Sequence, residues 1–334
     1  MNIAAYFASL SLTNLLSRMP AAVAQGIIWG LMALGVYITF RLLDVADLTV
    51  DGSFTTGGAV TAVLILAGWP AWAALLVALV AGILAGLCTG LIHTRLGIPA
   101  ILSGILTQFA LYSINLRIMS KNPNLSASVS KFGMIWEAEG GKGFLLSSRF
   151  VPQAILVGLF LAALIIGVCY WYFGTEQGSA LRATGSNPAM SRAQGINIDT
   201  MKVLGLALSN GLVALGGGLM TQFQGYADIN MGRGAIVIGL AAVIIGEVLC
   251  DALFHKGCNF AVRLAFVVGG GIAYYIVMTI ILWLKLDSND LKLFTAVIVA
   301  VFLAVPYLQS QARSSFKHAG KMAQKAGKEA EPHA

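Results

Sequence analysis

The chain contains a series of long apolar runs, each close to the roughly 20 residues that a helix needs to cross a bilayer. Hydrocarbon offers no partners for backbone N–H and C=O groups, so each run must be a helix, or a broken helix packed against protein or lining a cavity. Because 58% of the residues are hydrophobic and 10% are charged, a soluble globule is excluded. We predict an all-α polytopic membrane protein with about nine transmembrane helices, within a range of about eight to ten. The predicted spans lie near 21–40, 50–68, 71–93, 98–118, 151–173, 201–222, 234–250, 262–285 and 291–309.

Polar segments divide the chain around this transmembrane domain, which we place at 21–309. Residues 1–20 mix leucines with polar residues and lack the positive start of a secretory signal peptide, so we predict an interfacial segment. Segment 119–150 mixes lysines with aromatic residues and predicts an external loop, either lying in the membrane interface or forming a plain cap. The basic tail, 310–334, suits an anionic lipid surface and has no pattern typical of nucleic-acid binding.

Residues 175–197 form a polar island between two apolar runs and predict a hairpin of two short helices. Thr175 can cap the first helix, and Gly185 can end it in the left-handed conformation. Asn187 followed by Pro188 is typical of a second helix start, and Gly195 can end that helix. Such a hairpin is suited to a partner's groove. The alternative is a solvated loop.

Several motifs in and after this island carry a resemblance to a known family. The runs Ala-Leu-Arg-Ala-Thr-Gly-Ser-Asn at 180–187 and Gln-Gly-Ile-Asn at 194–197 resemble the coupling loop of ABC-importer permeases of the branched-chain amino acid and ribose superfamily, with a type II importer-like fold. Segments 205–215, 224–228 and 236–247 resemble its tryptophan/tyrosine-type branch. The resemblance is dense over 175–250 and looser over 25–110. The chain departs from the pattern at Gly232-Arg233-Gly234, where an apolar residue is expected between the glycines.

The resemblance implies the permease subunit of an importer in the bacterial cytoplasmic (inner) membrane. A separate ATPase would dock on the cytoplasmic hairpin, and an extracytoplasmic solute-binding protein would deliver the solute. Two copies, or this chain and a related permease, would form the pore. The implied solute is a small amino acid, with aromatic ones among the candidates. The resemblance places ATPase coupling on Leu181, Arg182, Ala183, Thr184, Gly185, Asn187, Arg192 and Gly195.

An internal echo predicts an inverted-topology repeat. Ala-Asp-Leu-Thr-Val at 46–50 is answered by Ala-Asp-Ile-Asn-Met at 227–231, and Gly58 then falls in step with Gly239. An odd number of predicted spans separates the copies, so they would enter the membrane from opposite faces. The alternative is coincidence, because the match is short.

Polar residues near these two points are costly inside a membrane and are therefore candidates for a pathway. For the acidic residues, the alternative role is helix capping at a membrane edge. For the amides, it is hydrogen bonding between helices. The pathway candidates are Asp47, Asp51, Ser53, Asn210, Gln224, Asp228 and Asn230.

The sequence lacks the common motifs of nucleotide-binding proteins and hydrolases. No G-x-x-x-x-G-K-[ST] phosphate loop, H-E-x-x-H or G-x-S-x-G occurs in the sequence, so we expect no catalytic residue and no cofactor, and a membrane-embedded enzyme is disfavoured. The four cysteines lack C-x-x-C spacing, which predicts neither a disulfide framework nor a zinc site. An ion- or proton-coupled secondary transporter remains the alternative function, because it would also use acidic residues and inverted repeats.

Overall fold

The computed structural model describes residues 12–127, 144–254 and 258–283, together with the helical positions 293, 296, 297, 300, 301 and 304. The chain divides into two units, 1–286 and 287–334, and the fold described below is that of the first. Residues 1–11, the central part of the 119–150 loop, most of the predicted ninth span and the tail lie outside the described residues.

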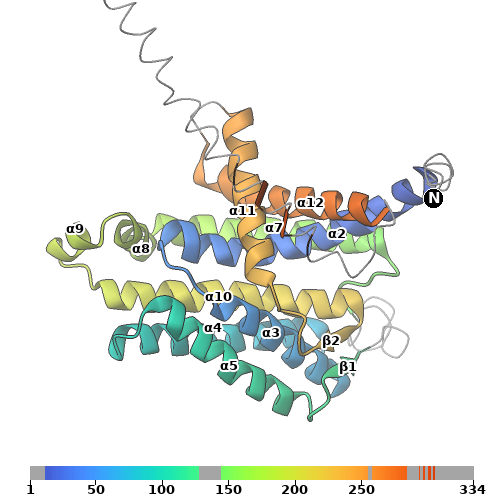
Figure 1. The fold of residues 1–334 in the computed structure, drawn as a ribbon, viewed down its shortest axis with the longest axis horizontal. Coiled ribbons are helices and arrows are strands. Elements are labelled where there is room, and N and C mark those ends of the chain that lie inside the picture. Colours follow the sequence, from blue (N-terminus) through green and yellow to red (C-terminus); the bar gives the residue numbers. More distant parts are fainter. Residues whose placement is uncertain are drawn as a thin grey trace, which may run out of the picture. The chain divides into compact units, whose positions relative to one another are not determined.

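The first unit is built from helices connected by short segments (Figure 1). Eight of its described helices are long and apolar enough to cross a membrane, and they correspond in order to the first eight predicted spans. They are α2 (Leu12–Tyr37) with the π-helical η1 (Ile38–Leu42), α3 (Thr49–Leu66), α4 (Ala71–Arg95), α5 (Ala100–Ile118), α7 (Val151–Gly174), α10 (Ile198–Gln224), α11 (Ala235–Leu253) and α12 (Phe260–Trp283). The remaining elements are the helices α8 (Glu176–Ser186) and α9 (Pro188–Ala193) and the strands β1 (Asn124–Ser126) and β2 (Tyr226–Asp228).

One boundary differs clearly from the prediction. The first helix begins at Leu12 and continues through Pro20, whereas the sequence predicted an interfacial segment as far as residue 20. Proline lacks a backbone N–H and removes one helical hydrogen bond, which can kink a helix without ending it. Pro20 therefore lies inside α2, and the boundary predicted at residue 20 is not an end of this helix.

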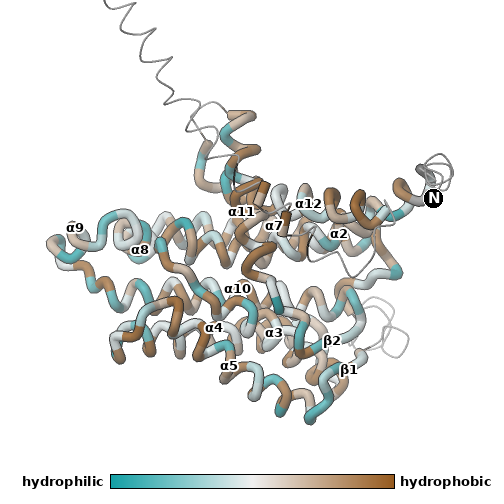
Figure 2. Tube along the Cα trace, in the orientation of Figure 1, coloured by the Kyte–Doolittle hydropathy of each residue, from teal (hydrophilic) through white to brown (hydrophobic). Residues whose placement is uncertain are grey.

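Burial separates inner helices from outer ones. The most apolar windows of α2, α3 and α10 are 83%, 78% and 72% buried, whereas those of α5 and α7 are 28% buried. Helix α10 packs between α2 on one side and the pair α3 and α4 on the other (Figure 1). The outer helices α4 and α7 have the highest mean hydropathy, and Figure 2 shows them largely in the hydrophobic colours. This arrangement fits a bundle surrounded by lipid, because the outward faces of these helices are apolar.

Close packing of α4 on α10 depends on a ridge of small residues on α4. Gly82, Gly86 and Gly90 recur every fourth residue, and all three face the α10 backbone. A Cβ at Gly86 would overlap the carbonyl group of Leu206, and one at Gly90 would lie 2.8 Å from the Cα of Val203. The ridge is therefore a helix-packing face of the small-x-x-x-small type.

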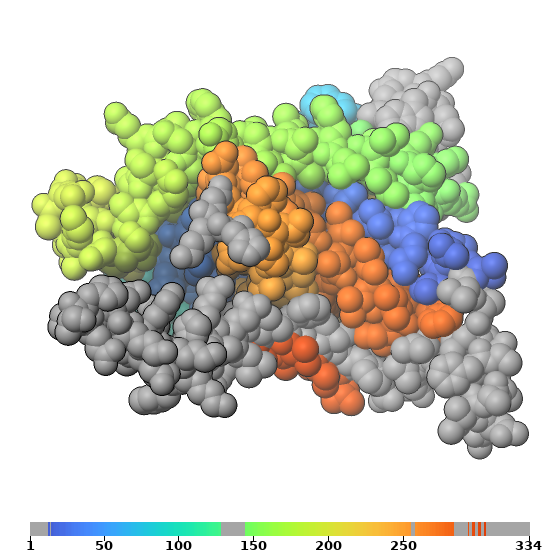
Figure 3. All heavy atoms as spheres, turned by 90° about the horizontal axis from the view of Figure 1, so that it is seen from above, coloured from blue at the N-terminus to red at the C-terminus, as the bar shows by residue number. Residues whose placement is uncertain are grey.

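Helix α11 runs across α2 and α12 rather than along them (Figure 1), and the view from above shows α11 as a compact group of atoms beside α12 (Figure 3). Where α11 crosses α12, Gly246 and Gly270 allow the two backbones to meet. A glycine is required there because an added Cβ at either position would overlap the backbone of the other helix.

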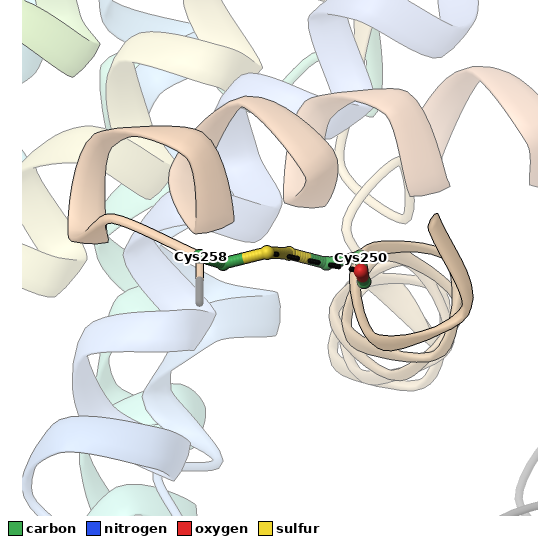
Figure 4. The surroundings of a disulfide bond; sticks show 2 residues. All are labelled: Cys250 and Cys258. Atoms are coloured by element: carbon green, nitrogen blue, oxygen red, sulfur yellow. Dashed lines mark hydrogen bonds between the residues drawn. A yellow bond between two sulfur atoms is a disulfide. The ribbon is translucent and has the colours of Figure 1, made fainter. Parts of the chain in front are cut away.

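The prediction that the cysteines form no disulfide was wrong for one pair. Cys250, near the end of α11, and Cys258, shortly before α12, form a disulfide (Figure 4). Their Cα atoms lie 7.0 Å apart, one near the end of α11 and the other shortly before α12. Spacing alone did not reveal the pair, since it depends on the packing of α11 against α12 and follows no recognisable cysteine motif. Of the other cysteines, Cys169 is buried and Cys88 is exposed.

Candidate functional site

The hairpin at 175–197 forms as predicted, from caps encoded locally in its sequence. The Thr175 hydroxyl accepts a hydrogen bond of 3.3 Å from the Gly178 amide at the start of α8. The Asn187 side chain accepts one of 3.0 Å from the Met190 amide at the start of α9, with Pro188 as the first helical residue. After α9, Gly195 has a φ of +83°. These contacts satisfy backbone donors that a helix start leaves free.

Gly185 plays a different part from the one predicted. It lies inside α8, which continues to Ser186, and it is not among the residues with positive φ. A Cβ at this position would overlap the carbonyl group of Leu42, at the end of η1. The glycine therefore allows close approach of two backbones and does not end the helix, so this prediction was wrong.

The hairpin has one buried face and one exposed face. Leu181 is completely buried and Thr184 is 2% exposed, so neither side chain is accessible on the surface. Arg182 is exposed at the edge, and its guanidinium lies 5.8 Å from the ring centre of Phe260. Ala183 and Gly185 are half-buried. Exposed residues of α9 and its flanking turns are Ser186, Asn187, Pro188, Ala189, Met190, Arg192, Ala193, Gln194, Gly195 and Asn197, and those of α8 are Glu176, Gln177, Ser179 and Arg182.

The buried face of the hairpin is seated on three membrane helices. Gly178 packs on the backbone of Phe173, at the end of α7. Gly185 packs on Leu42 of η1, and Leu181 lies next to Gly205 of α10. A displacement of the hairpin would therefore act on the ends of α7, η1 and α10 together, since close-packed contacts transmit movement.

A buried polar network brings together three of the seven predicted pathway residues. The Asn210 side-chain amide donates to the Asp47 carboxylate at 2.6 Å, and the Ser53 hydroxyl donates to Asn210 Oδ1 at 2.6 Å. All three side chains are buried, with Asp47 3% exposed. Because Asn210 lies near the middle of α10, the segment 43–48 returns into the bundle before α3 begins.

The two copies of the sequence echo form the same local turn. Asp47 Oδ1 accepts from the Thr49 amide at 2.9 Å, and Asp228 Oδ1 accepts from the Asn230 amide at 2.7 Å. Both are aspartate turns in which the side chain bonds to the backbone two residues on. The likeness between the two copies thus extends from sequence to local geometry.

Asp51 connects the two halves of the echo. Its carboxylate, on the first turn of α3, accepts hydrogen bonds of 3.0 Å from the amides of Gly234 and Ile236 at the start of α11. A negative charge at a helix N-terminus is favoured by the free N–H groups and by the helix dipole. Helix capping is the alternative role given above for the acidic residues. Asp51 does cap a helix, and that helix, α11, is distant in the sequence.

The remaining pathway candidates line a cavity of about 390 Å³ next to β2. Gln224, Asp228 and Asn230 contribute polar side chains to it, together with Asn124 and Tyr226. Asn124 of β1 donates to Asp228 Oδ2 at 3.4 Å, and Asn124 and Asp228 are also paired in the antiparallel ladder. Trp29 and Phe54, stacked with ring centres 4.9 Å apart, line the same cavity.

A second cavity, of about 470 Å³, contains Asp51 together with residues that the sequence analysis did not select. Gln108, Tyr112 and Asn115 line it from α5, and their spacing of four and three residues is that of one helix face. That spacing was a signal available in the sequence. Arg233, noted there only as a departure from the family pattern, lines the cavity from the turn before α11.

Most of the chain is similar to known proteins. Residues 19–306 match the family described as "Branched-chain amino acid transport system / permease component". A tyrosine transport system permease protein of Clostridioides difficile is 37% identical over 86% of this chain and 91% of its own length. An uncharacterized protein of Rickettsia prowazekii is 33% identical over 85% of this chain and 95% of its own length. A probable branched-chain amino acid transport permease protein of Methanocaldococcus jannaschii is 27% identical over 65% of this chain and 69% of its own length.

Proposed function

Because this chain belongs to the family of permease components of branched-chain amino acid transport systems, we propose that it is the transmembrane subunit of an ATP-binding-cassette importer for an amino acid. A separate ATPase would bind the exposed face of the α8–α9 hairpin. An extracytoplasmic binding protein would deliver the solute at the opposite end of the bundle. Two copies of the chain, or this chain and a related permease, would enclose the pathway in a bacterial cytoplasmic membrane.

The single observation that carries this proposal is the construction of the hairpin. Its two short helices are capped by Thr175 and Asn187, so they hold their shape without a partner. One face is fully anchored on the bundle, while Met190, which is 59% exposed, and Arg192 project from the other. A rigid, anchored element with an exposed apolar and cationic tip is suited to docking in a groove of another protein.

The seat of the hairpin supports mechanical coupling. Movement of α8 against Leu42 would displace η1 and the segment 43–48 that follows it. That segment contains Asp47, which is bound to Asn210 in the middle of α10. Two-state movement of a packed element is a common way for a local contact to alter a distant site. ATP-driven closure of the ATPases would thus displace η1 and segment 43–48, near the proposed pathway. This chain itself would carry out no covalent chemistry.

The relatives support the proposed class of solute. A tyrosine transport permease covers most of the chain at 37% identity, which supports an amino acid and places aromatic ones among the candidates. The cavity next to β2 supports the same proposal, because Trp29 and Phe54 are stacked beside the polar side chains of Gln224 and Asp228. Apolar walls with a few polar groups are usual in small-molecule sites.

The proposal can be tested by co-purification. The chain is expressed together with candidate ATPase and binding-protein subunits from the same organism, and a tag on this chain is used to recover the complex. We expect the ATPase to accompany the wild-type chain and to be lost from Arg192→Glu, which reverses a charge at the tip of the hairpin. Arg95→Glu is the matched control, because Arg95 is an exposed arginine outside the hairpin.

Recovery of the wild-type chain without any ATPase would contradict the proposal and favour the secondary transporter. Equal recovery of ATPase with Arg192→Glu and with the wild type would leave an importer but would show that the hairpin tip is not its docking surface. Each preparation is examined by size-exclusion chromatography, so that a misfolded variant is recognised before its partners are scored.

A further inference from the structure

The cavity lined by α3, α5 and the turn before α11 holds two opposite charges. Asp51 and Arg233 both line it, yet they form no ion pair within 4.0 Å of each other. Among the described residues, the one ion pair joins Arg41 and Glu247, so no described carboxylate neutralises the Arg233 guanidinium. Arg233 lies in the turn before α11 and is exposed, so its guanidinium can be reached by an anionic group. The cavity thus presents a guanidinium that no carboxylate of the described residues pairs with.

A buried amide in the same cavity lacks a hydrogen-bond partner. Asn115 is 1% exposed, and its Oδ1 accepts no hydrogen bond from the described residues. Its Nδ2 lies 3.5 Å from the Gly52 carbonyl oxygen. A buried acceptor without a donor is costly, and native proteins seldom retain one without a reason. A ligand that supplies N–H groups would satisfy it.

Asp51 can also accept further hydrogen bonds. The amides of Gly234 and Ile236 each use one of its oxygens, whereas a carboxylate has about four lone-pair sites. Asp51 and Asn115 therefore offer acceptors in the cavity, beside the polar side chains of Thr55, Gln108 and Tyr112, and Arg233 is its cationic donor. Phe109 and Tyr112 add aromatic wall from α5. The volume of about 470 Å³ is within the usual range for a small-molecule site.

We propose that this cavity binds the zwitterionic head group of a free amino acid during its passage through the membrane. Arg233 would pair with the carboxylate, for which a guanidinium is suited by its planar set of donors. Asn115 Oδ1 and Asp51 would accept from the ammonium group, and the aromatic wall would contact the side chain. This inference rests on the proposed function, because it names how the transported amino acid is recognised.

Binding to the purified full-length chain in lipid nanodiscs tests the inference directly. The probes are radiolabelled L-tyrosine and L-leucine, with tyramine, which lacks the carboxylate, and 3-(4-hydroxyphenyl)propionate, which lacks the ammonium group. We expect saturable binding of L-tyrosine and a loss of affinity of about tenfold or more with tyramine, since a charge-assisted contact is removed. No saturable binding of either amino acid would overturn the inference.

Variants of two residues assign the two ends of the head group. Arg233→Ala should weaken L-tyrosine about tenfold or more, and Arg233→Lys should recover part of that loss. Asn115→Leu should weaken L-tyrosine while leaving 3-(4-hydroxyphenyl)propionate unchanged, because only the ammonium group is recognised there. Arg117→Ala is the matched control, since Arg117 is an exposed arginine of α5 that does not line the cavity. Wild-type affinity in Arg233→Ala would contradict the proposal.

The same preparations separate this inference from the proposed function. Each variant is also scored for recovery of the ATPase. An Arg233→Ala chain that keeps the ATPase and loses L-tyrosine supports both proposals. A wild-type chain that keeps the ATPase but binds L-tyrosine and tyramine equally well leaves the importer intact and rules out zwitterion recognition. A chain that binds L-tyrosine through Arg233 but never recovers an ATPase supports this site and contradicts the importer.

Discussion

The side-chain amide of Asn210 donates a 2.6 Å hydrogen bond to the carboxylate of Asp47, although 163 positions separate the two residues. Oδ1 of the same side chain accepts a hydrogen bond from the Ser53 hydroxyl. One side chain therefore joins segment 43–48, α3 and α10. Asn210 Nδ2 also donates to the Leu206 carbonyl at 2.9 Å. In a membrane such a buried network is satisfied internally or not at all. It therefore holds the start of α3 at a defined depth in the bundle.

Asn210→Leu should destabilise the protein more than Asp47→Asn. Leucine removes both donors and the acceptor, leaving a buried carboxylate without its partner, and we expect a loss of about 1–3 kcal/mol. In Asp47→Asn, a flip of the Asn210 amide restores hydrogen bonds to both neighbours, so the loss should be smaller. Thermal unfolding in detergent measures both. Gln194→Leu, on the exposed hairpin, controls for the polar-to-apolar change. Equal melting of Asn210→Leu and wild type would show that the network contributes no stability.

Asp51→Asn should loosen the start of α11. The charged cap of Gly234 and Ile236 becomes neutral, and we expect a local loss of about 0.5–2 kcal/mol, as for other helix caps. Hydrogen exchange of the amides at 234–236 should accelerate, with little change in α4. Asp44→Asn is the control, since Asp44 is exposed and asparagine tolerates its φ of 54°. Unchanged exchange at 234–236 would contradict a capping role for Asp51.

Gly185→Ala should destabilise the seat of the hairpin. In an open helix position this change is favourable by about 0.8–1 kcal/mol, because alanine is the better helix former. At Gly185 the added methyl group would overlap the Leu42 carbonyl, and overpacking of this kind costs about 1–3 kcal/mol. Gly167→Ala is the matched control, because nothing lies within 4 Å of a Cβ built there. The two variants should therefore shift the melting temperature in opposite directions. A higher melting temperature for Gly185→Ala would contradict the close packing of the hairpin on Leu42.

Asp228→Asn tests the cavity next to β2. Asparagine can form the same turn with the Asn230 amide, so the melting temperature should change little. The negative charge in the cavity is lost, however, and we expect uptake of L-tyrosine into proteoliposomes containing the full complex to fall about tenfold. Asp44→Asn is measured in parallel as the control, since that exposed carboxylate lines neither of the two cavities near α3. Normal uptake by Asp228→Asn would leave Asp228 with a turn-forming role alone.

The features predicted correctly are those encoded within a few residues. The spans follow from apolar length, because the membrane requires about 20 residues per helix whatever its neighbours. The hairpin caps were predictable because Thr175 and Asn187 bond to amides three residues ahead. The glycines of the α4 ridge recur every fourth residue, which is a spacing visible in the sequence. In each case the physical cause lies within one helix or one turn.

The errors and omissions share the opposite property. The role of Gly185 depends on Leu42, and the disulfide of Cys250 with Cys258 depends on the packing of α11 against α12. The cavity of Asn115 and Arg233 combines a helix with a turn that follows it by more than one hundred residues, so no local pattern could join them. Only their individual oddities, an amide on an apolar helix and an arginine between glycines, were visible.

By itself, the sequence determined that the chain is a helical membrane protein, where most of its spans lie and how its polar hairpin folds, because hydrophobicity and capping act locally. The tertiary structure decided which polar residues meet. It buried Asp47 in a network, set Asp51 on the N-terminus of α11 and left Arg233 lining a cavity without a described anion. Those outcomes depend on how helices pack across the chain, since hydrogen bonds and ion pairs act only between groups that packing brings within a few ångströms.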